Sequence, residues 1–262
     1  MKKNLLCIGI GLTAGIFGGL IGLGGGIIMV PLLTGLVKMD QCRAHGTSLA
    51  VLIFTGISGA VTYGLHGQVN WPAALALAVP AVLTAPAGAL LADRLPDWKL
   101  KRTFGLFLIF CSFLLLFKPL LGDVPGMLSR PAALAALAVT GTFTGFLSGL
   151  MGVGGGTIMV PAMILLAGFS QHGAQGTALM VMVPAGATGA FTHWRLGNVD
   201  HVSLACMAPG ILLGAYIGGS AAQTIPDDPL RWLFVVVAIY TGWRYLRAIK
   251  PDVACDADIQ AS

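Results

Sequence analysis

The sequence predicts an all-α integral membrane protein built from two related halves in inverted topology. Only 10% of its 262 residues are charged and 56% are hydrophobic, whereas soluble domains carry about 25% charge. Nearly uncharged runs of about 18 residues or more recur, long enough to cross a hydrocarbon core of about 30 Å as helices. They are too continuously apolar for the alternating strands of an outer-membrane barrel. A glycine-rich sequence motif in the first half recurs in the second half, which predicts an internal repeat.

The repeated motif contains three consecutive glycines. Residues 15–31 read GIFGGLIGLGGGIIMVP, and residues 145–161 read GFLSGLMGVGGGTIMVP, with 11 of 17 positions identical. The offset that pairs position 15 with position 145 holds along the rest of both halves. Glycine is about 1 kcal/mol less favourable than alanine inside a helix, so each triplet should break its helix. We therefore expect two broken helices with structural roles for the flanking residues Gly22, Pro31, Gly152 and Pro161.

The remaining elements follow in the same order in both halves. A straight helix over residues 4–37 would reach roughly 50 Å, too long for one span, so we expect a re-entrant hairpin turning at the glycines. Three spanning helices should follow it. They are expected at about 44–64, 73–92 and 103–117, and the second half repeats the pattern with a broken segment at 132–167 and spans at about 176–192, 203–221 and 230–248. This gives repeats at 1–121 and 132–249, a loop at 122–131 and a polar tail at 250–262.

Lysine and arginine residues predict how the halves are oriented. With four plain spans in each half, the two sides of the membrane would hold 8 and 7 basic residues, which is no bias. With re-entrant hairpins, one side holds 12 and the other only Lys118, Arg130 and Arg231. Basic residues concentrate in cytoplasmic loops. We therefore expect inverted repeats in the inner membrane, with both termini cytoplasmic.

The glycine breaks are candidate anion-binding elements. Broken helices inside a bilayer need protein or water around them, and a half-helix that starts after each triplet offers unpaired N–H groups and a positive dipole end. Two such ends meeting at a repeat interface would form a mid-membrane anion site. The candidate substrate-binding residues are Gly24, Gly25, Gly26, His45, Thr47, Ser48, Gly154, Gly155, Gly156, Gln175 and Thr177.

Some of these residues have plainer interpretations. Gly15 and Gly19 form a small-xxx-small pattern that favours helix packing. Hydroxyls such as Thr47 often bond their own helix. His45 is a candidate for proton coupling, because histidine titrates near physiological pH. His66, His193 and His201 lie near predicted loops and are interpreted as interfacial residues.

Enzyme signatures are missing from the sequence. HExxH and GxSxG do not occur, and the glycine run lacks the terminal lysine of a nucleotide-binding loop. The spans contain almost no carboxylates, which argues against a cation pump. We expect no catalytic residue, metal or cofactor, and interpret the net charge of +5 as topogenic rather than as a nucleic-acid surface.

The chain resembles the TauE/SafE family of sulfite and organosulfonate permeases. The resemblance rests on Gly22–Gly26 followed by Val30-Pro31, on Gly46–Leu49, and on the second copy at Gly152–Gly156, Val160-Pro161 and Gly176-Thr177. It covers roughly residues 5–248. It implies a secondary transporter for a small sulfur-containing anion, with alternating access to a site at the repeat interface.

Two other functions stay open at this stage. One is a membrane chaperone or assembly partner that transports nothing, and the other is an anion channel. Besides a small anionic substrate and membrane lipid, a proton or other coupling ion and a second copy in a homodimer are candidate partners.

Overall fold

A computed structural model describes residues 2–92, 102, 105–106, 108–110, 112–113, 115–116 and 130–247. Within these ranges the chain forms helices joined by turns, and no strand occurs. Most of the predicted fourth span at 103–117 lies outside the described residues or is described only in pieces. The loop at 93–101, most of the link at 118–131 and the tail at 250–262 also lie outside them.

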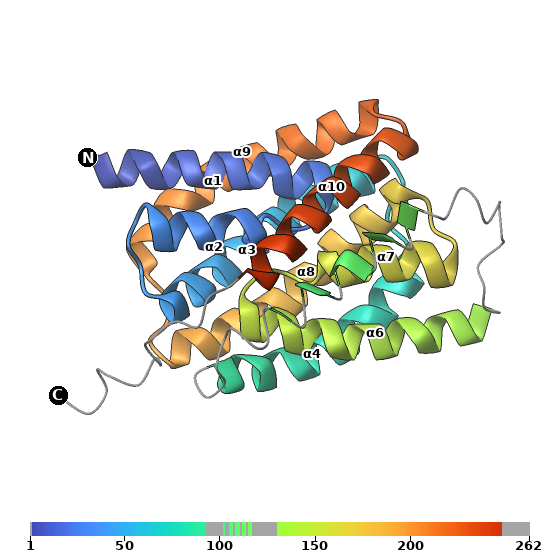
Figure 1. The fold of residues 1–262 in the computed structure, drawn as a ribbon, viewed down its shortest axis with the longest axis horizontal. Helices are drawn as coiled ribbons and strands as arrows, with labels where there is room; N and C mark the ends of the chain where they lie inside the picture. The colour runs from blue at the N-terminus through green and yellow to red at the C-terminus, as the bar shows by residue number, and fades with distance from the viewer. Residues whose placement is uncertain are drawn as a thin grey trace.

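The described helices run roughly side by side in an elongated bundle (Figure 1). They are α1 (Lys2–Ile21), α2 (Gly26–Gly35), α3 (Gln41–Leu65), α4 (Trp71–Ala92), α6 (Arg130–Met151), α7 (Gly156–Ala167), α8 (Gln171–Arg195), α9 (His201–Thr224) and α10 (Asp227–Leu246).

Helix lengths and exposed side chains fit a membrane protein. Four described helices, α3, α4, α6 without its first residue, and α9, are long and apolar enough to cross a bilayer. Large apolar side chains cover the outer faces; Leu75, Phe143 and Leu213 are 62%, 62% and 61% exposed. Soluble monomers rarely expose contiguous apolar patches of such extent. The described chain is therefore an all-helical, multi-pass membrane protein.

The glycine breaks divide each long segment into unequal arms. The arms before the breaks, α1 and α6, have 20 and 22 residues. The arms after them, α2 and α7, have only 10 and 12 residues, or roughly 15–18 Å of helix. A re-entrant hairpin that dips only to the middle of the membrane would have such a short second arm. Whether they return to the side from which they came stays a prediction.

Element boundaries repeat at the same offset as the sequence. Both ends of α3 and α8 obey it, and so do the starts of α4 and α9. Gly67 and Gly197, with φ of 68° and 75°, follow the ends of α3 and α8. Asn70 and Asp200 then cap the next helices by accepting from the amides of residues 73 and 203. The repeated sequences at 67–70 and 197–200 are thus helix stop and start signals.

Each half packs its first helix along the third long helix of the other half. Cβ atoms added at Gly15 and Gly19 would run into the α9 backbone at Ile211 and Ala215. The equivalent Gly145 approaches α4 in the same way, at Ala81. The predicted small-xxx-small packing role of Gly15 and Gly19 is therefore confirmed.

The second long helices, α3 and α8, cross at the centre of the bundle. Gly46 near the start of α3 lies against Asn198 just after α8, whereas Gly59 near the end of α3 lies against Leu179 near the start of α8. The two helices are therefore antiparallel, although they are equivalent in the repeat. Equivalent α1 and α6 also run in opposite directions in Figure 1, where α1 begins at the N-terminal label.

Candidate functional site

Each glycine break is a tight loop that depends on left-handed backbone. Positive φ occurs at Gly22 (74°), Gly24 (78°), Gly25 (82°), Gly152 (63°) and Gly154 (74°). Such values are unfavourable for residues with a Cβ, so glycine is needed here. Gly155, which is equivalent to Gly25, is the exception, because its φ is −74° whereas that of Gly25 is 82°. The two breaks therefore differ in conformation at one position, which is Gly155 in the second half.

The two breaks lie directly against each other. A Cβ added at Gly26 would lie 2.8 Å from the carbonyl oxygens of Gly152 and Val153. A Cβ at the equivalent Gly156 would overlap the Gly22 carbonyl oxygen. The structure thus brings the two predicted glycine triplets together at one interface between the halves, at a separation that only bare backbone allows.

Unpartnered amides gather where α2 and α7 begin. The amides of Ile28 and Met29 donate to the Gly25 carbonyl at 3.1 and 3.0 Å. The preceding amides, from Gly24 to Ile27, donate to no acceptor within the described residues, and residues 154–157 behave in the same way. Helix N-termini with free amides carry a partial positive charge and attract anions. The chemistry of this interface is therefore suited to an anion.

Two equivalent apolar side chains seal the space between the triplets. A Cβ at Gly24 would lie 2.9 Å from both Leu52 Cδ2 and Met182 Sδ. A Cβ at Gly154 would lie 3.1 Å from Leu52 Cδ1 and 3.6 Å from Met182 Sδ. Leu52 and Met182 are both buried. These two side chains, one from each of the central helices α3 and α8, close the candidate anion site.

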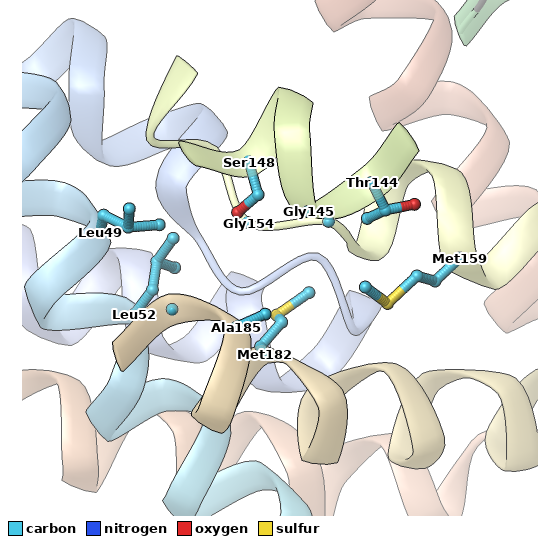
Figure 2. Close-up of a pocket in the computed structure, with 11 residues that line it drawn as sticks. Leu49, Leu52, Thr144, Gly145, Ser148, Gly154, Met159, Met182 and Ala185 are labelled. Atoms are coloured by element: carbon cyan, nitrogen blue, oxygen red, sulfur yellow. The ribbon is translucent and has the colours of Figure 1, made fainter. Parts of the chain in front are cut away.

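A small cavity of about 10 Å³ remains beside the second break (Figure 2). It has room for about one water molecule. Its lining is Leu49, Leu52, Thr144, Gly145, Ser148, Gly154, Gly155, Met159, Met182, Ala185 and Gly186. Only Gly154 and Gly155 were among the predicted site residues. The sequence did hold a signal for Ser148, which stands in the second copy of the motif where the first has Gly18; Figure 2 shows its hydroxyl beside Gly154.

Thr47 and Thr177 connect the halves to each other. The amide of Asp200 donates to Thr47 Oγ1 at 2.9 Å, and the amide of Asn70 donates to Thr177 Oγ1 at 3.0 Å. Both hydroxyls are fully buried. Each threonine therefore holds the start of a long helix in the opposite half, and a contact with substrate stays a prediction for both.

Ser48 and His45 bind the end of α6, at the second break. Ser48 Oγ donates to the Gly152 carbonyl at 2.9 Å, and His45 Nδ1 lies 3.4 Å from the Leu150 carbonyl. A carbonyl oxygen only accepts, so these side chains act as donors. They satisfy carbonyls that a helix end leaves without partners in its own helix. Both predicted residues therefore lie at the glycine breaks.

His193 performs the same task from α8. Its Nε2 donates to the Gly149 carbonyl at 2.8 Å, and its side chain is fully buried. The interfacial interpretation of His193 is therefore wrong, because the histidine turns inward to cap α6. The hydroxyl of its equivalent Tyr63 lies 3.1 Å from the Gly19 carbonyl oxygen and 2.9 Å from Gln175 Oε1, and its single proton can be donated to only one of them at a time. Gln175 Nε2 is buried without a partner among the described residues.

A larger cavity of about 400 Å³ lies between α2, α3 and the end of α10. Its lining is Val30, Pro31, Thr34, Gln41, His45, Met151, Arg244, Tyr245 and Arg247. It thus reaches from two arginines to His45 and to the last residue of α6. Another cavity, of about 530 Å³, lies between α4 and α8 and has a mostly apolar lining that includes Phe191 and Arg195.

No group of three or more histidine, cysteine, aspartate or glutamate residues placed to hold a metal ion occurs within the described part of the chain. The polar groups at the breaks are backbone amides and carbonyls, hydroxyls and imidazoles, of which the amides, hydroxyls and imidazoles can donate hydrogen bonds. This set can bind an anion and hold it in place.

Comparisons with known proteins agree with a transporter. The family model described as sulfite exporter TauE/SafE matches residues 7–245. The probable membrane transporter protein YunE of Bacillus subtilis is 30% identical, over 91% of this chain and 95% of its own. Probable membrane transporter proteins of Methanocaldococcus jannaschii and Haemophilus influenzae are 28% and 26% identical, over 86% and 90% of this chain and 89% and 96% of theirs. No solved structure matches.

Proposed function

Because the chain belongs to the sulfite exporter TauE/SafE family of membrane transporters, and not to an enzyme family, we propose that it moves a small sulfur-containing anion. Sulfite and organosulfonates are the substrates we expect. The observation that carries the proposal is the pairing of two glycine breaks, each followed by a helix whose first amides have no acceptor in the described chain. Two positive helix ends at one interface favour an anion over a cation.

An inverted arrangement of the repeats is part of the proposal. Antiparallel α3 and α8 support it, because a two-fold axis that relates antiparallel helices is perpendicular to them. Helices that span a bilayer would then place this axis in the membrane plane, as in other inverted-repeat transporters. With the partition of basic residues, this arrangement puts both termini in the cytoplasm. A reporter fused within residues 122–126 should lie outside the cytoplasm, and a cytoplasmic reporter would refute the topology.

Transport requires the site to open, because the present cavity of about 10 Å³ is too small for an oxyanion. The halves already differ in a way that supports alternating access. Gln41 is half-buried beside the 400 Å³ cavity, whereas its equivalent Gln171 is only 3% exposed. Likewise Val30 is 9% exposed and Val160 is fully buried. The first half is therefore more exposed than the second at these two positions, and an exchange of the two conformations would expose the equivalent positions on the opposite side.

The proposed exchange has a specific hinge. Gly25 has a φ of 82° and Gly155 has −74°, although the two residues are equivalent. If the halves exchange conformations, Gly25 must take negative φ and Gly155 positive φ. Each residue precedes the first residue of a short helix, so the rotation would re-aim α2 and α7 at the anion site. Glycine at both positions allows both conformations.

Flux measurements test the function directly. Proteoliposomes that contain the purified protein should take up labelled sulfite, taurine or sulfoacetate, with saturation and with acceleration by unlabelled substrate on the opposite side. Absence of flux of every anion, with correctly folded protein in the membrane, would refute the proposal. Flux that never saturates would identify a channel. Repeating the assay with an imposed pH gradient tests coupling to protons.

A further inference from the structure

We propose that the 400 Å³ cavity is a second anion-binding site, a docking site that substrate occupies on its way to or from the glycine breaks. We call this cavity the arginine vestibule and define it by Thr34, Gln41, His45, Met151, Arg244 and Arg247. The inference rests on the proposed function, because it assigns the substrate of that function, a small oxyanion, to this cavity.

The charge of the vestibule is positive. Arg244 and Arg247 line it, and no carboxylate does so among the described residues. Arg244 makes no ion pair or hydrogen bond within the described part of the chain. The described aspartates of α10 lie at its other end, where Asp227 hydrogen-bonds His172 and Asp228 forms an ion pair with Arg231. The arginines therefore keep their charge available to a ligand.

Arg247 is held in a position that suits an oxyanion. Its guanidinium carbon lies 3.8 Å from the centre of the Trp243 ring. This contact uses the face of the guanidinium and leaves the N–H groups at its edge. Those N–H groups form a fork that matches two oxygens of a sulfite or sulfonate group, and charge-assisted bonds of this kind are among the strongest in proteins.

The inner end of the vestibule reaches the glycine breaks. His45 lines the cavity and also packs on the second break, since a Cβ added at Gly152 would lie 2.8 Å from His45 Cα. Met151, the last residue of α6, directly precedes that break. An anion bound at the arginines is therefore separated from the break by His45 and Met151. The vestibule has the position of an entrance to the proposed central site.

Topogenic charge is the plain alternative for these arginines, and the chain contains a matched control. Arg195 also lies near the end of a helix and also stacks on an aromatic ring, 4.5 Å from the centre of Phe191. It lines the 530 Å³ cavity, whose other described lining residues are uncharged and do not include a glycine break. If bulk charge at one membrane surface is all that matters, Arg195, Arg244 and Arg247 should be equivalent.

Sequence equivalence also favours a specific role. The positions that match Arg244 and Arg247 in the first half are Leu114 and Phe117. The arginine pair is therefore not a feature that both halves need for their fold. The arginine pair occurs at one end of the molecule only, which is what a docking site on one side of the membrane requires.

The test compares Arg244→Gln, Arg247→Gln and Arg195→Gln in proteoliposomes, with sulfite and taurine as probes. Loss of one charge-assisted contact should raise KM on the order of tenfold in the first two variants. Arg195→Gln should keep KM within about twofold of the parent. Arg247→Lys, which keeps the charge and loses the fork, should fall between them. Equal KM values in all three glutamine variants would overturn the vestibule while leaving the transport function intact.

A binding readout separates failure of the vestibule from failure of the function. Sulfite added to the detergent-solubilised protein should change Trp243 emission with saturation, because Trp243 touches Arg247; Trp243→Phe identifies its share of the signal. The change should weaken in Arg244→Gln and persist in Arg195→Gln. Absence of flux with a saturable Trp243 response would overturn the proposed function and leave the vestibule as an anion-binding site without a role in transport. Absence of any such response would overturn the vestibule.

Discussion

Alanine at Gly25 and at Gly155 should have opposite effects on the conformation of the protein. At Gly25, with φ of 82°, a Cβ would overlap the Ala14 carbonyl oxygen and lie 3.0 Å from its carbon. Left-handed backbone costs a residue with a Cβ about 1–2 kcal/mol, and overpacking against rigid backbone adds about 1–3 kcal/mol. Gly25→Ala should therefore disfavour the present conformation by about 2–5 kcal/mol.

Gly155 has φ of −74°, which alanine adopts without strain. Its Cβ would overlap the Cγ2 methyl of Thr144 and lie 2.9 Å from the Met159 terminal methyl. Thr144 is held by a 2.7 Å hydrogen bond to the Thr140 carbonyl, which Thr144→Ser can keep while removing the methyl. The double variant Gly155→Ala/Thr144→Ser should thus fit the present conformation, with a gain of about 0.4–1 kcal/mol from the less flexible unfolded chain.

If the halves exchange conformations during transport, this double variant should transport slowly. Transport would then require positive φ at residue 155, which disfavours the opposite conformation by about 1–2 kcal/mol. The population of the opposite conformation should fall about five- to thirtyfold. We expect a Tm at or above that of Thr144→Ser alone, measured by thermal challenge and size-exclusion chromatography, together with sulfite flux lower by a factor in this range. Gly25→Ala should instead lower the Tm.

Chemical labelling shows which conformation each variant favours. Thr34 lines the 400 Å³ cavity and is half-buried, so a cysteine there reports access to the cavity. Labelling of Thr34→Cys by a maleimide should increase with Gly155→Ala/Thr144→Ser and decrease with Gly25→Ala. If the double variant transports as fast as Thr144→Ser, or if both alanine variants change labelling in the same direction, the hinge and the exchange are wrong.

Three further predictions follow from contacts between the halves. Thr47→Val and Thr177→Val each leave a buried amide without an acceptor, so each should lower stability by about 1–3 kcal/mol; an unchanged KM for sulfite would exclude the substrate role, and a raised KM would support it. Met182→Ala should lower stability by about 2–5 kcal/mol and raise sulfoacetate flux relative to sulfite; an unchanged ratio would mean that Met182 does not close the site. His193→Phe, which removes the donor to the buried Gly149 carbonyl, should lower stability by about 1–3 kcal/mol, whereas His201→Phe, at an exposed residue, should change it by less than about 0.5 kcal/mol; equal stability of the two variants would mean that His193 does not cap α6.

Sequence patterning was enough to predict which parts of the described chain are helical. Hydropathy located the long helices, and the constant offset between the halves predicted helix boundaries that recur at that offset in the structure. The triple glycines predicted both breaks because their backbone requirement is local. The short length of α2 also followed from local spacing, because the polar link at 38–43 comes soon after the first triplet.

Contacts between the halves could not be predicted in the same way. Thr47 and Thr177 were chosen as polar groups near the breaks, but their hydrogen-bond partners Asp200 and Asn70 belong to the opposite half of the chain. Position along the chain also misled the interpretation of His193, which lies near the end of α8 yet is fully buried. Its direction depends on α6, which packs beside it only in the folded protein. The cavity that Arg244 and Arg247 line likewise combines α10 with α2 and α3, which the sequence alone does not place beside one another.

The residues that differ between the halves make the two proposed conformations unequal in energy. The end of α6 receives His45, Ser48 and His193, whereas the end of α1 receives the neutral phenol of Tyr63. Carbonyl ends of helices carry partial negative charge, so the additional donors stabilise the end of α6 more than the end of α1. His45 lines the vestibule together with Arg244 and Arg247, whereas Tyr63 does not. An anion in the vestibule should therefore affect the cap of α6 and not that of α1, so the two conformations should respond unequally to substrate.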